Sequence, residues 1–268
     1  MLNRSDFLKL VGGAVGAVSC GLMTACAADT SREAGGEMSE EQRETGNSQG
    51  RVLARPAPPS PPPTTPAGLR PLGIGSGRDG LLYIPPGYGG GAEKAPLAVM
   101  LHGAGGSARS GISHFLDLAD EAGLVLLAPE SRGRTWDVLV GGYGPDVAFI
   151  DRALGQTFDR LAVDPGRLAA VGFSDGASYA LSLGLTNGDL FTRVIAFSPG
   201  FAAPAARRGR PPIFVSHGTR DRVLPIERCS RRIVPVLKRE GYEVSYKEFD
   251  GGHAVPRSIA REALEWFV

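Results

Sequence analysis

The stretch Val171-Gly172-Phe173-Ser174-Asp175-Gly176-Ala177 decides how the rest of the chain is interpreted. It places a serine between two glycines, with an apolar run before it and residues compatible with a helix after it. Such a serine would lie on a sharp turn between a strand and a helix, where small glycines let the backbone pack closely. With 38 glycines in 268 residues the pattern also arises by accident, so its meaning depends on its surroundings.

The residues around this motif alternate between apolar runs and amphipathic segments, which is typical of a parallel sheet covered by helices on both faces. We expect two strands between residues 72 and 84, and further strands at 97–101, 124–128, 167–173, 194–197, 213–216 and 244–249. We expect helices at 112–122, 146–161, 175–185, 226–240 and 258–267. In such a sheet, catalytic groups gather at the carboxyl ends of the strands, and the motif serine lies at one of them.

A serine hydroxyl is a weak nucleophile at neutral pH, so it needs a base and an acid that orients the base. Asp221 and His253 each follow one of the last two expected strands, so they belong to the same edge of the sheet as Ser174. The order serine, aspartate, histidine is that of one structural class of serine hydrolases. Asp250 is an alternative acid, but it lies only three residues before His253, which is too close in a loop to be preferred.

A glycine-rich turn follows the first long apolar run, in the stretch Leu101-His102-Gly103-Ala104-Gly105-Gly106-Ser107. Attack on a carbonyl creates an oxyanion, which positioned backbone N–H groups must stabilise. One such donor is expected in a turn at this place, and the other is the N–H of the residue after the nucleophile, Asp175. The Asp175 carboxylate itself is expected to face the start of a helix, where a negative charge is favourable.

Residues 71–268 resemble the α/β-hydrolase fold, with a mostly parallel central sheet and helices on both faces. They are most similar to serine esterases related to polyhydroxyalkanoate depolymerases and feruloyl esterases, and to the phospholipase/carboxylesterase group. The resemblance rests on Leu101-His102-Gly103-Ala104-Gly105-Gly106, Gly172-Phe173-Ser174-Asp175-Gly176, His217-Gly218 with Asp221 and Pro225, and Gly252-His253. One departure is Ala177, where many relatives have a glycine, and alanine is small enough for the predicted fold to stand.

The resemblance implies a role for each matching position. Ser174 is the expected nucleophile, His253 the general base and then acid, and Asp221 the acid that orients His253. The backbone amides of Ala104 and Asp175 are the expected oxyanion hole. We therefore expect cleavage of carboxylic esters in two steps through an acyl-enzyme, without a cofactor. The alternatives are a serine peptidase of the same fold and a tethered binding lipoprotein without catalysis.

Two aromatic residues follow a buried strand and are candidates for a substrate pocket. Trp136 and Tyr143 could overhang the carboxyl edge of the sheet and line the pocket together with Gly105. For both aromatic residues, packing in the core is the alternative. His102 and His217 precede glycines at strand ends, where hydrogen bonding to loop backbone is a simpler role than catalysis.

The first 26 residues resemble an export signal. Their apolar run at 11–23 is short for a membrane span but suits the core of a signal peptide. Met23-Thr24-Ala25-Cys26 resembles a lipobox, in which the cysteine is acylated and becomes the mature N-terminus. The alternative is ordinary cleavage at Ala25-Cys26-Ala27, which would give a soluble product. We expect an exported protein that is periplasmic, attached to the cell envelope or secreted.

Residues 27–70 separate this signal from the predicted catalytic domain at 71–268. They are poor in apolar side chains and include a proline-rich run at 56–66. Such a segment buries too little surface to fold alone, and consecutive prolines favour an extended spacer. We therefore expect a disordered, proline-rich tether.

Charge and cysteine content exclude some classes of partner. The chain has 29 Lys and Arg against 28 Asp and Glu, a net charge of +1, so we expect no nucleic-acid partner. Cys20 and Cys26 lie in the predicted signal and leave Cys229 alone, so we expect neither a disulfide nor a metal site. We expect a monomer that takes a small-molecule or polymeric ester and meets the membrane only through a lipid on Cys26.

Overall fold

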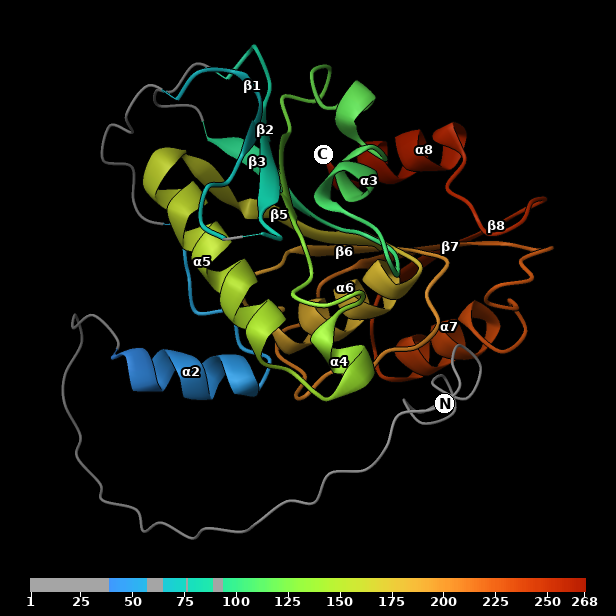
Figure 1. The fold of residues 1–268 in the computed structure, drawn as a ribbon. Coiled ribbons are helices and arrows are strands. Elements are labelled where there is room, and N and C mark those ends of the chain that lie inside the picture. The colour runs from blue at the N-terminus through green and yellow to red at the C-terminus, as the bar shows by residue number, and fades with distance from the viewer. Residues whose placement is uncertain (1–38, 57–64, 76, 89–93) are drawn as a thin grey trace, which may run out of the picture.

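The computed structural model describes residues 39–56, 65–75, 77–88 and 94–268, and its strands form one eight-stranded sheet (Figure 1). Across the sheet the order is β1 (Gly68–Pro71), β2 (Gly80–Ile84), β4 (Val125–Pro129), β3 (Ala95–Leu101), β5 (Val163–Phe173), β6 (Arg193–Phe197), β7 (Ile213–Gly218) and β8 (Val244–Phe249). The pairs β1–β2 and β2–β4 are antiparallel, and the other pairs are parallel. The predicted, mostly parallel sheet is confirmed.

Two groups of helices cover the two faces of the sheet. One apolar core includes residues of α3 (Ala108–Ile112), the short 3-10 helix η1 (Leu116–Leu118) and α8 (Arg257–Phe267). The other includes residues of α4 (Asp137–Val140), α5 (Pro145–Arg160), α6 (Asp175–Thr186) and α7 (Ser230–Arg239). Figure 1 shows α3 and α8 on one side of the sheet and α5, α6 and α7 on the other. Strands β3 and β4 are buried along their whole length because they lie between these layers.

The prediction of one helix at residues 112–122 is wrong. In this region α3 ends at Ile112 and the short η1 follows. The buried side chains of Ile112, Phe115 and Leu118 are three residues apart. Successive hydrogen bonds join Phe115 N–H to the Ile112 carbonyl and Leu118 N–H to the Phe115 carbonyl, the pattern of 3-10 turns. A spacing of three suits such turns as well as an α-helix, so the apolar pattern alone did not separate them.

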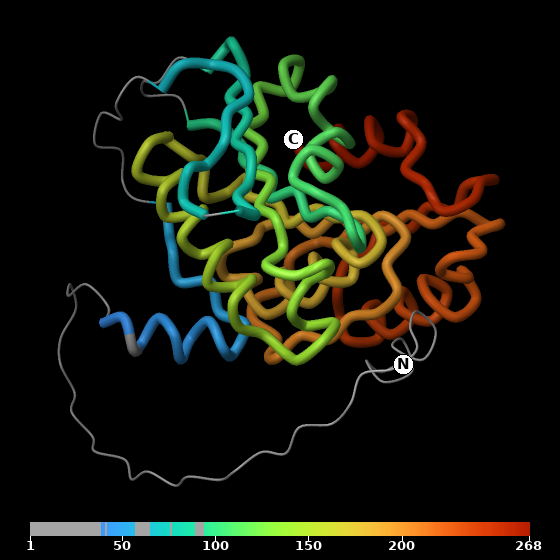
Figure 2. Tube along the Cα trace, viewed as in Figure 1, coloured from blue at the N-terminus to red at the C-terminus, as the bar shows by residue number. Residues whose placement is uncertain are grey.

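Part of the predicted disordered tether is folded, which corrects the expectation for residues 27–70. Helix α2 (Glu40–Ser48) begins with a capping box between Ser39 and Gln42. Residues 50–55, which we call the N-terminal strap, then run beside α5, and Figure 2 shows them in blue next to the yellow-green helix. Strand β1 also begins within the predicted tether.

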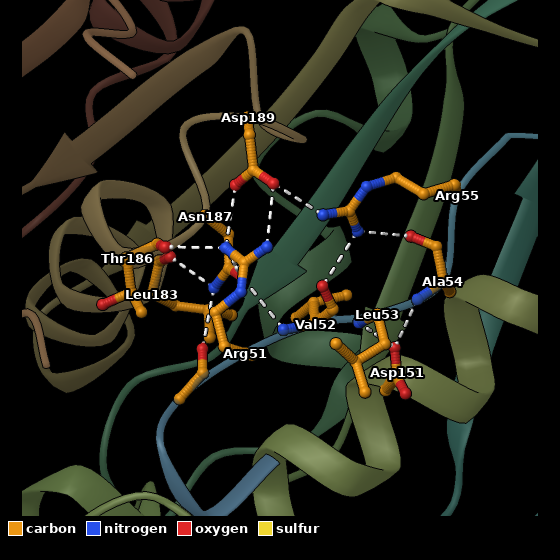
Figure 3. A network of polar contacts seen from close by, with 11 residues as sticks. Arg51, Val52, Leu53, Ala54, Arg55, Asp151, Leu183, Thr186, Asn187 and Asp189 are labelled. Atoms are coloured by element: carbon orange, nitrogen blue, oxygen red, sulfur yellow. Dashed lines mark hydrogen bonds and ion pairs between the residues drawn. The ribbon is translucent and has the colours of Figure 1, made fainter. Parts of the chain in front are cut away.

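The N-terminal strap is held by a buried carboxylate on α5 (Figure 3). The Asp151 Oδ1 atom accepts hydrogen bonds from Leu53 N–H at 2.6 Å and Ala54 N–H at 2.7 Å. The Val52 side chain is fully buried in the apolar core on this side of the sheet. Two backbone donors and one apolar side chain thus find partners that the composition of the strap does not reveal.

A second group of contacts fixes the strap to the end of α6 (Figure 3). The Asn187 side chain accepts a hydrogen bond from Val52 N–H at 2.9 Å and donates one to the Gly50 carbonyl at 2.8 Å. Arg51 donates to Asn187 Oδ1 at 3.0 Å and forms a bidentate pair with Asp189 at 2.8 Å for each bond. The strap is therefore part of the folded domain.

The predicted export signal, the lipobox at Cys26 and residues 57–64 of the proline-rich run at 56–66 lie outside the described residues, and they stay predictions. Within the described ranges, no helix combines the length and the apolar character that crossing a bilayer requires.

Candidate active site

Ser174 lies on the turn between β5 and α6, as the sequence predicts. Its backbone has φ 58° and ψ −120°, a conformation that residues other than glycine rarely adopt. The turn is fixed by a hydrogen bond from Ser174 N–H to the Phe197 carbonyl of β6, at 2.9 Å. A Cβ atom at Gly172 would lie 2.1 Å from the Gly176 carbonyl oxygen, and one at Gly176 would lie 2.1 Å from that of Leu101. Only glycine fits at both positions.

His253 joins Ser174 to Asp221. Ser174 follows β5, Asp221 lies in the loop after β7, and His253 lies in the loop after β8. Its Nε2 atom lies 2.8 Å from Ser174 Oγ, and its Nδ1 atom lies 2.6 Å from Asp221 Oδ2. Because an ionised carboxylate only accepts hydrogen bonds, Nδ1 carries the proton in this arrangement. Nε2 is then free to accept the proton of the serine hydroxyl. The Phe173 ring packs against the imidazole, with 4.7 Å between the ring centroids.

Asp221 is buried and held in place on its other oxygen. Its Oδ1 atom accepts hydrogen bonds from Val223 N–H at 2.9 Å and Leu224 N–H at 2.8 Å. The alternative acid, Asp250, is exposed and forms an ion pair with Arg220 at 3.0 Å. Of the two carboxylates, the structure places Asp221 against His253.

The other two strand-end histidines have partners of their own. His217 Nε2 donates to the Leu224 carbonyl at 2.7 Å, so its Nδ1 accepts from Ser230 Oγ, also at 2.7 Å. His102 Nε2 accepts from Ser131 N–H at 3.1 Å, so its Nδ1 donates to the carbonyl of the next residue at 2.7 Å. Burial lowers the pKa of both imidazoles, which keeps them neutral. Both side chains organise the loops around Ser174.

The glycine-rich loop after β3 passes beside the nucleophile turn. A Cβ atom at Gly103 would lie 3.4 Å from the Ser174 Cβ. The N–H of Ala104 has no hydrogen-bond acceptor among the described residues, and Asp175 is the first residue of α6, where the helix leaves N–H groups unpaired. The N–H of Gly105, in contrast, donates to the Arg134 carbonyl at 2.6 Å.

Trp136 and Tyr143 are packing residues rather than lining of an open pocket. Trp136 is fully buried, stacks on Tyr179 of α6 at 4.9 Å and donates from Nε1 to the His102 carbonyl at 2.8 Å. Tyr143 is half-buried and donates from its hydroxyl to the Ala203 carbonyl at 2.9 Å. For both, core packing is the alternative that the structure supports. Trp136 additionally connects the glycine-rich loop to the helix that begins at the nucleophile.

The Asp175 side chain has a partner that the sequence did not indicate. Thr135 Oγ1 donates to Asp175 Oδ2 at 2.6 Å, and Asp175 is buried. Burial raises the pKa of Asp175, and the hydrogen bond from Thr135 opposes this shift. The bond ties the loop after β4 to the start of α6. The contact between Thr135 and Asp175 spans 40 residues, and no motif marks it.

Two buried carboxylates close the loop that carries Trp136. Asp137 Oδ2 accepts from the N–H groups of Gly144 and Asp146, both at 2.9 Å, and Asp146 Oδ2 accepts from Asp137 N–H at 2.6 Å. Asp146 also accepts from Arg132 N–H. Burial raises the pKa of Asp146 to about 6 and raises that of Asp137. Among the described His, Cys, Asp and Glu side chains, no cluster is arranged to hold a metal ion.

A hollow lies near His253, between the α3–η1 segment and α8. It is lined by Ser113, His114, Asp117, Leu118, Val255, Arg257 and Ala260. The His114 ring contacts Phe173, with 5.5 Å between centroids, and Phe173 in turn packs on His253. His114 belongs to none of the sequence motifs. The structure places it one aromatic ring away from the candidate base.

Comparisons with known proteins agree with these observations. The family model described as phospholipase/carboxylesterase matches residues 147–266. A putative esterase, NocK, of Nocardia uniformis is 28% identical over 205 residues, covering 65% of this chain and 60% of the relative. Feruloyl esterase C of Emericella nidulans is 28% identical over 160 residues, covering 57% of this chain and 58% of the relative. The chain spans about three fifths of the length of these curated relatives.

Among solved structures, esterase PE8 has a TM-score of 0.58 and 24% sequence identity, over 70% of this chain and 96% of that chain. At this level of identity the likeness concerns the fold. Together with the sheet order, it confirms the predicted fold. The esterase resemblance rests on the family model and the two curated relatives.

Proposed function

We propose that this α/β-hydrolase cleaves carboxylic esters through an acyl-enzyme formed on Ser174. The observation that carries the proposal is the continuous hydrogen-bonded chain from Ser174 Oγ to His253 Nε2 at 2.8 Å and from His253 Nδ1 to Asp221 at 2.6 Å. These groups come from three separate loops and still meet in the order that nucleophile, base and orienting acid require. The esterase relatives support the same reaction class.

In the first step, Ser174 Oγ attacks the ester carbonyl while His253 Nε2 takes the hydroxyl proton. The negative charge that develops on the carbonyl oxygen is met by the N–H groups of Ala104 and Asp175. His253 then passes its proton to the leaving alcohol, and the acyl group stays on Ser174. Asp221 accepts the hydrogen bond from Nδ1 throughout and stabilises the imidazolium.

In the second step, a water molecule takes the place of the alcohol. His253 removes its proton, the water oxygen attacks the acyl carbon, and the acid leaves as the proton returns to Ser174. The hollow beside His114 and Phe173 is our candidate for holding one side of the ester, which is a small-molecule or polymeric substrate.

A fluorophosphonate probe tests the nucleophile, and a series of p-nitrophenyl esters of increasing acyl length tests the activity. We expect covalent labelling and ester hydrolysis by the full chain, and loss of both in Ser174→Ala. Ser258→Ala is the matched control, because Ser258 is an exposed serine on α8. No labelling would contradict the proposal and favour the non-catalytic binding protein. Labelling with hydrolysis of a peptide series but of no ester would favour the serine peptidase.

A further inference from the structure

Positive charge is concentrated in residues 205–239. This segment of 35 residues holds ten of the chain's 29 Lys and Arg but only two acidic residues, Asp221 and Glu227. The net charge of +1 for the whole chain conceals this separation. The segment comprises most of the β6–β7 connection, the loop that carries Asp221, and α7.

Most of these cations have no counter-charge. Three of the ten form ion pairs: Arg207 with Glu240, Arg220 with Asp250, and Arg231 with Glu227 and Glu248. The other seven are exposed and form no ion pair with a described residue: Arg208, Arg210, Arg222, Arg228, Arg232, Lys238 and Arg239.

Four of the seven cations lie on the exposed side of α7 or directly before it: Arg228, Arg232, Lys238 and Arg239. Arg207 and Arg210 of the β6–β7 connection lie beside this helix or the residue that follows it. Arg228 and Arg232 line a hollow together with Arg207 of the β6–β7 connection, over an apolar floor that includes Leu237. At the other end of α7, the Arg210 guanidinium lies beside Gly241. Since ten helical residues rise about 15 Å, the positive face extends at least that far from the loop of Asp221. We call it the α7 cationic face.

Stability of α7 does not explain this arrangement. Lys238 and Arg239 are at the C-terminal end, where the helix dipole favours positive charge. Arg228 and Arg232 lie at the N-terminal end, where the same dipole disfavours it, and neither has an acidic partner among the described residues. Their charges are therefore available to a ligand.

We propose that the α7 cationic face binds a linear anionic polymer that carries carboxylate or sulfate groups, such as an acidic polysaccharide. Nine of the ten cations are arginines, whose planar guanidinium groups pair bidentately with such oxyanions. A membrane fits less well, because Val223 is the one exposed large apolar side chain in residues 205–239. Proteins that bind single-stranded nucleic acid stack its bases on exposed aromatic side chains, and Phe214, the one Phe, Tyr or Trp in residues 205–239, is buried.

Titration of the full chain with polygalacturonate, at several NaCl concentrations, tests this proposal. We expect binding whose logarithm falls linearly with the logarithm of salt concentration, because the polymer releases counterions. The triple variant R228S/R232S/R239S should bind at least about tenfold more weakly. The slope of log K against log salt concentration should be less steep by roughly two to three. The control K94S/R109S/R152S loses the same charge from exposed positions elsewhere and should bind within about twofold of the natural chain.

Ser174→Ala should bind polygalacturonate as the natural chain does, so the result is independent of the proposed hydrolysis. Circular dichroism and p-nitrophenyl ester hydrolysis of both triple variants show that they are folded. The proposal would be overturned if both triple variants bound polygalacturonate equally weakly, or if the natural chain did not bind it. Tighter binding to phosphatidylglycerol vesicles or duplex DNA than to polygalacturonate would overturn the choice of partner.

Discussion

The Ser174 site and the N-terminal strap are both networks of polar groups from distant parts of the chain. In the Ser174 site, contacts of 2.8 Å and 2.6 Å span 79 and 32 residues. In the strap, contacts of 2.6 to 2.9 Å span 97 to 135 residues. Geometrically they are alike, yet the sequence predicts the first and assigns the second to a disordered tether.

The difference lies in what positions each network. The three residues of the Ser174 site each follow a parallel strand, so the fold itself brings them to one edge. The strap instead depends on individual side chains, Asp151 and Asn187, that have free hydrogen-bonding capacity on an otherwise ordinary helix layer. A recurrent topology makes the first kind of network predictable, whereas the second depends on its particular partners.

Removing charge from the site should affect activity far more than stability. Asp221→Asn keeps an acceptor for Val223 and Leu224 but presents an amide to His253, which favours the tautomer that cannot take the serine proton. We expect kcat for ester hydrolysis to fall by about 10³- to 10⁴-fold. Asp250→Asn is the control and should retain activity within a few fold; a comparable loss there would move the acid to Asp250.

Removing a partner of the strap should lower stability and leave activity unchanged. Asn187→Ala leaves the buried Val52 N–H and the Gly50 carbonyl without partners, which should lower the free energy of unfolding by about 2–4 kcal/mol. Urea denaturation measures the loss, and kcat of the folded fraction should be unchanged. Arg55→Ala, at an exposed position, should cost less than about 1 kcal/mol. Equal stability of the two variants would place the strap outside the cooperative fold.

Trp136 connects packing to chemistry and should show both effects. Trp136→Phe keeps an aromatic ring against Tyr179 but removes the donor to the His102 carbonyl, which precedes the proposed oxyanion loop. We expect kcat to fall by roughly 10- to 100-fold with little change in KM, since the loss concerns transition-state stabilisation. Trp266→Phe, on α8, is the matched control. A change in KM alone would assign Trp136 to substrate binding.

The pH dependence of stability should report the buried Asp146. Its pKa is about 6 in the folded chain against an ordinary 3.8, so the folded state binds the proton more tightly. This contribution is present in acid and is lost as the pH rises through 6. The stability of the natural chain relative to Asp146→Asn should therefore fall by about 2–3 kcal/mol between pH 4 and pH 7. Asp159→Asn, at an exposed position, serves as the control. A stability difference between the natural chain and Asp146→Asn that does not change with pH would contradict the raised pKa of Asp146.

These contrasts show which structural features the sequence predicts. Ser174 and its glycines, the sheet, and the positions of Asp221 and His253 follow from hydrophobic pattern and spacing. The burial of Trp136 does not, because a tryptophan after a strand can face the core or the solvent with the same local sequence. The bond from Thr135 to Asp175 and the contact of His114 with Phe173 also depend on how separate loops are oriented.

The N-terminal strap also has a consequence for the order of folding. Its residues precede their partners in the chain, because Asp151 and Asn187 follow 98 and 135 residues after the groups they bind. Closing such long loops is slow compared with forming local turns and helices. The strap can therefore dock only after α5 and the end of α6 have folded. In a refolding experiment, its backbone amides should become protected from hydrogen exchange late.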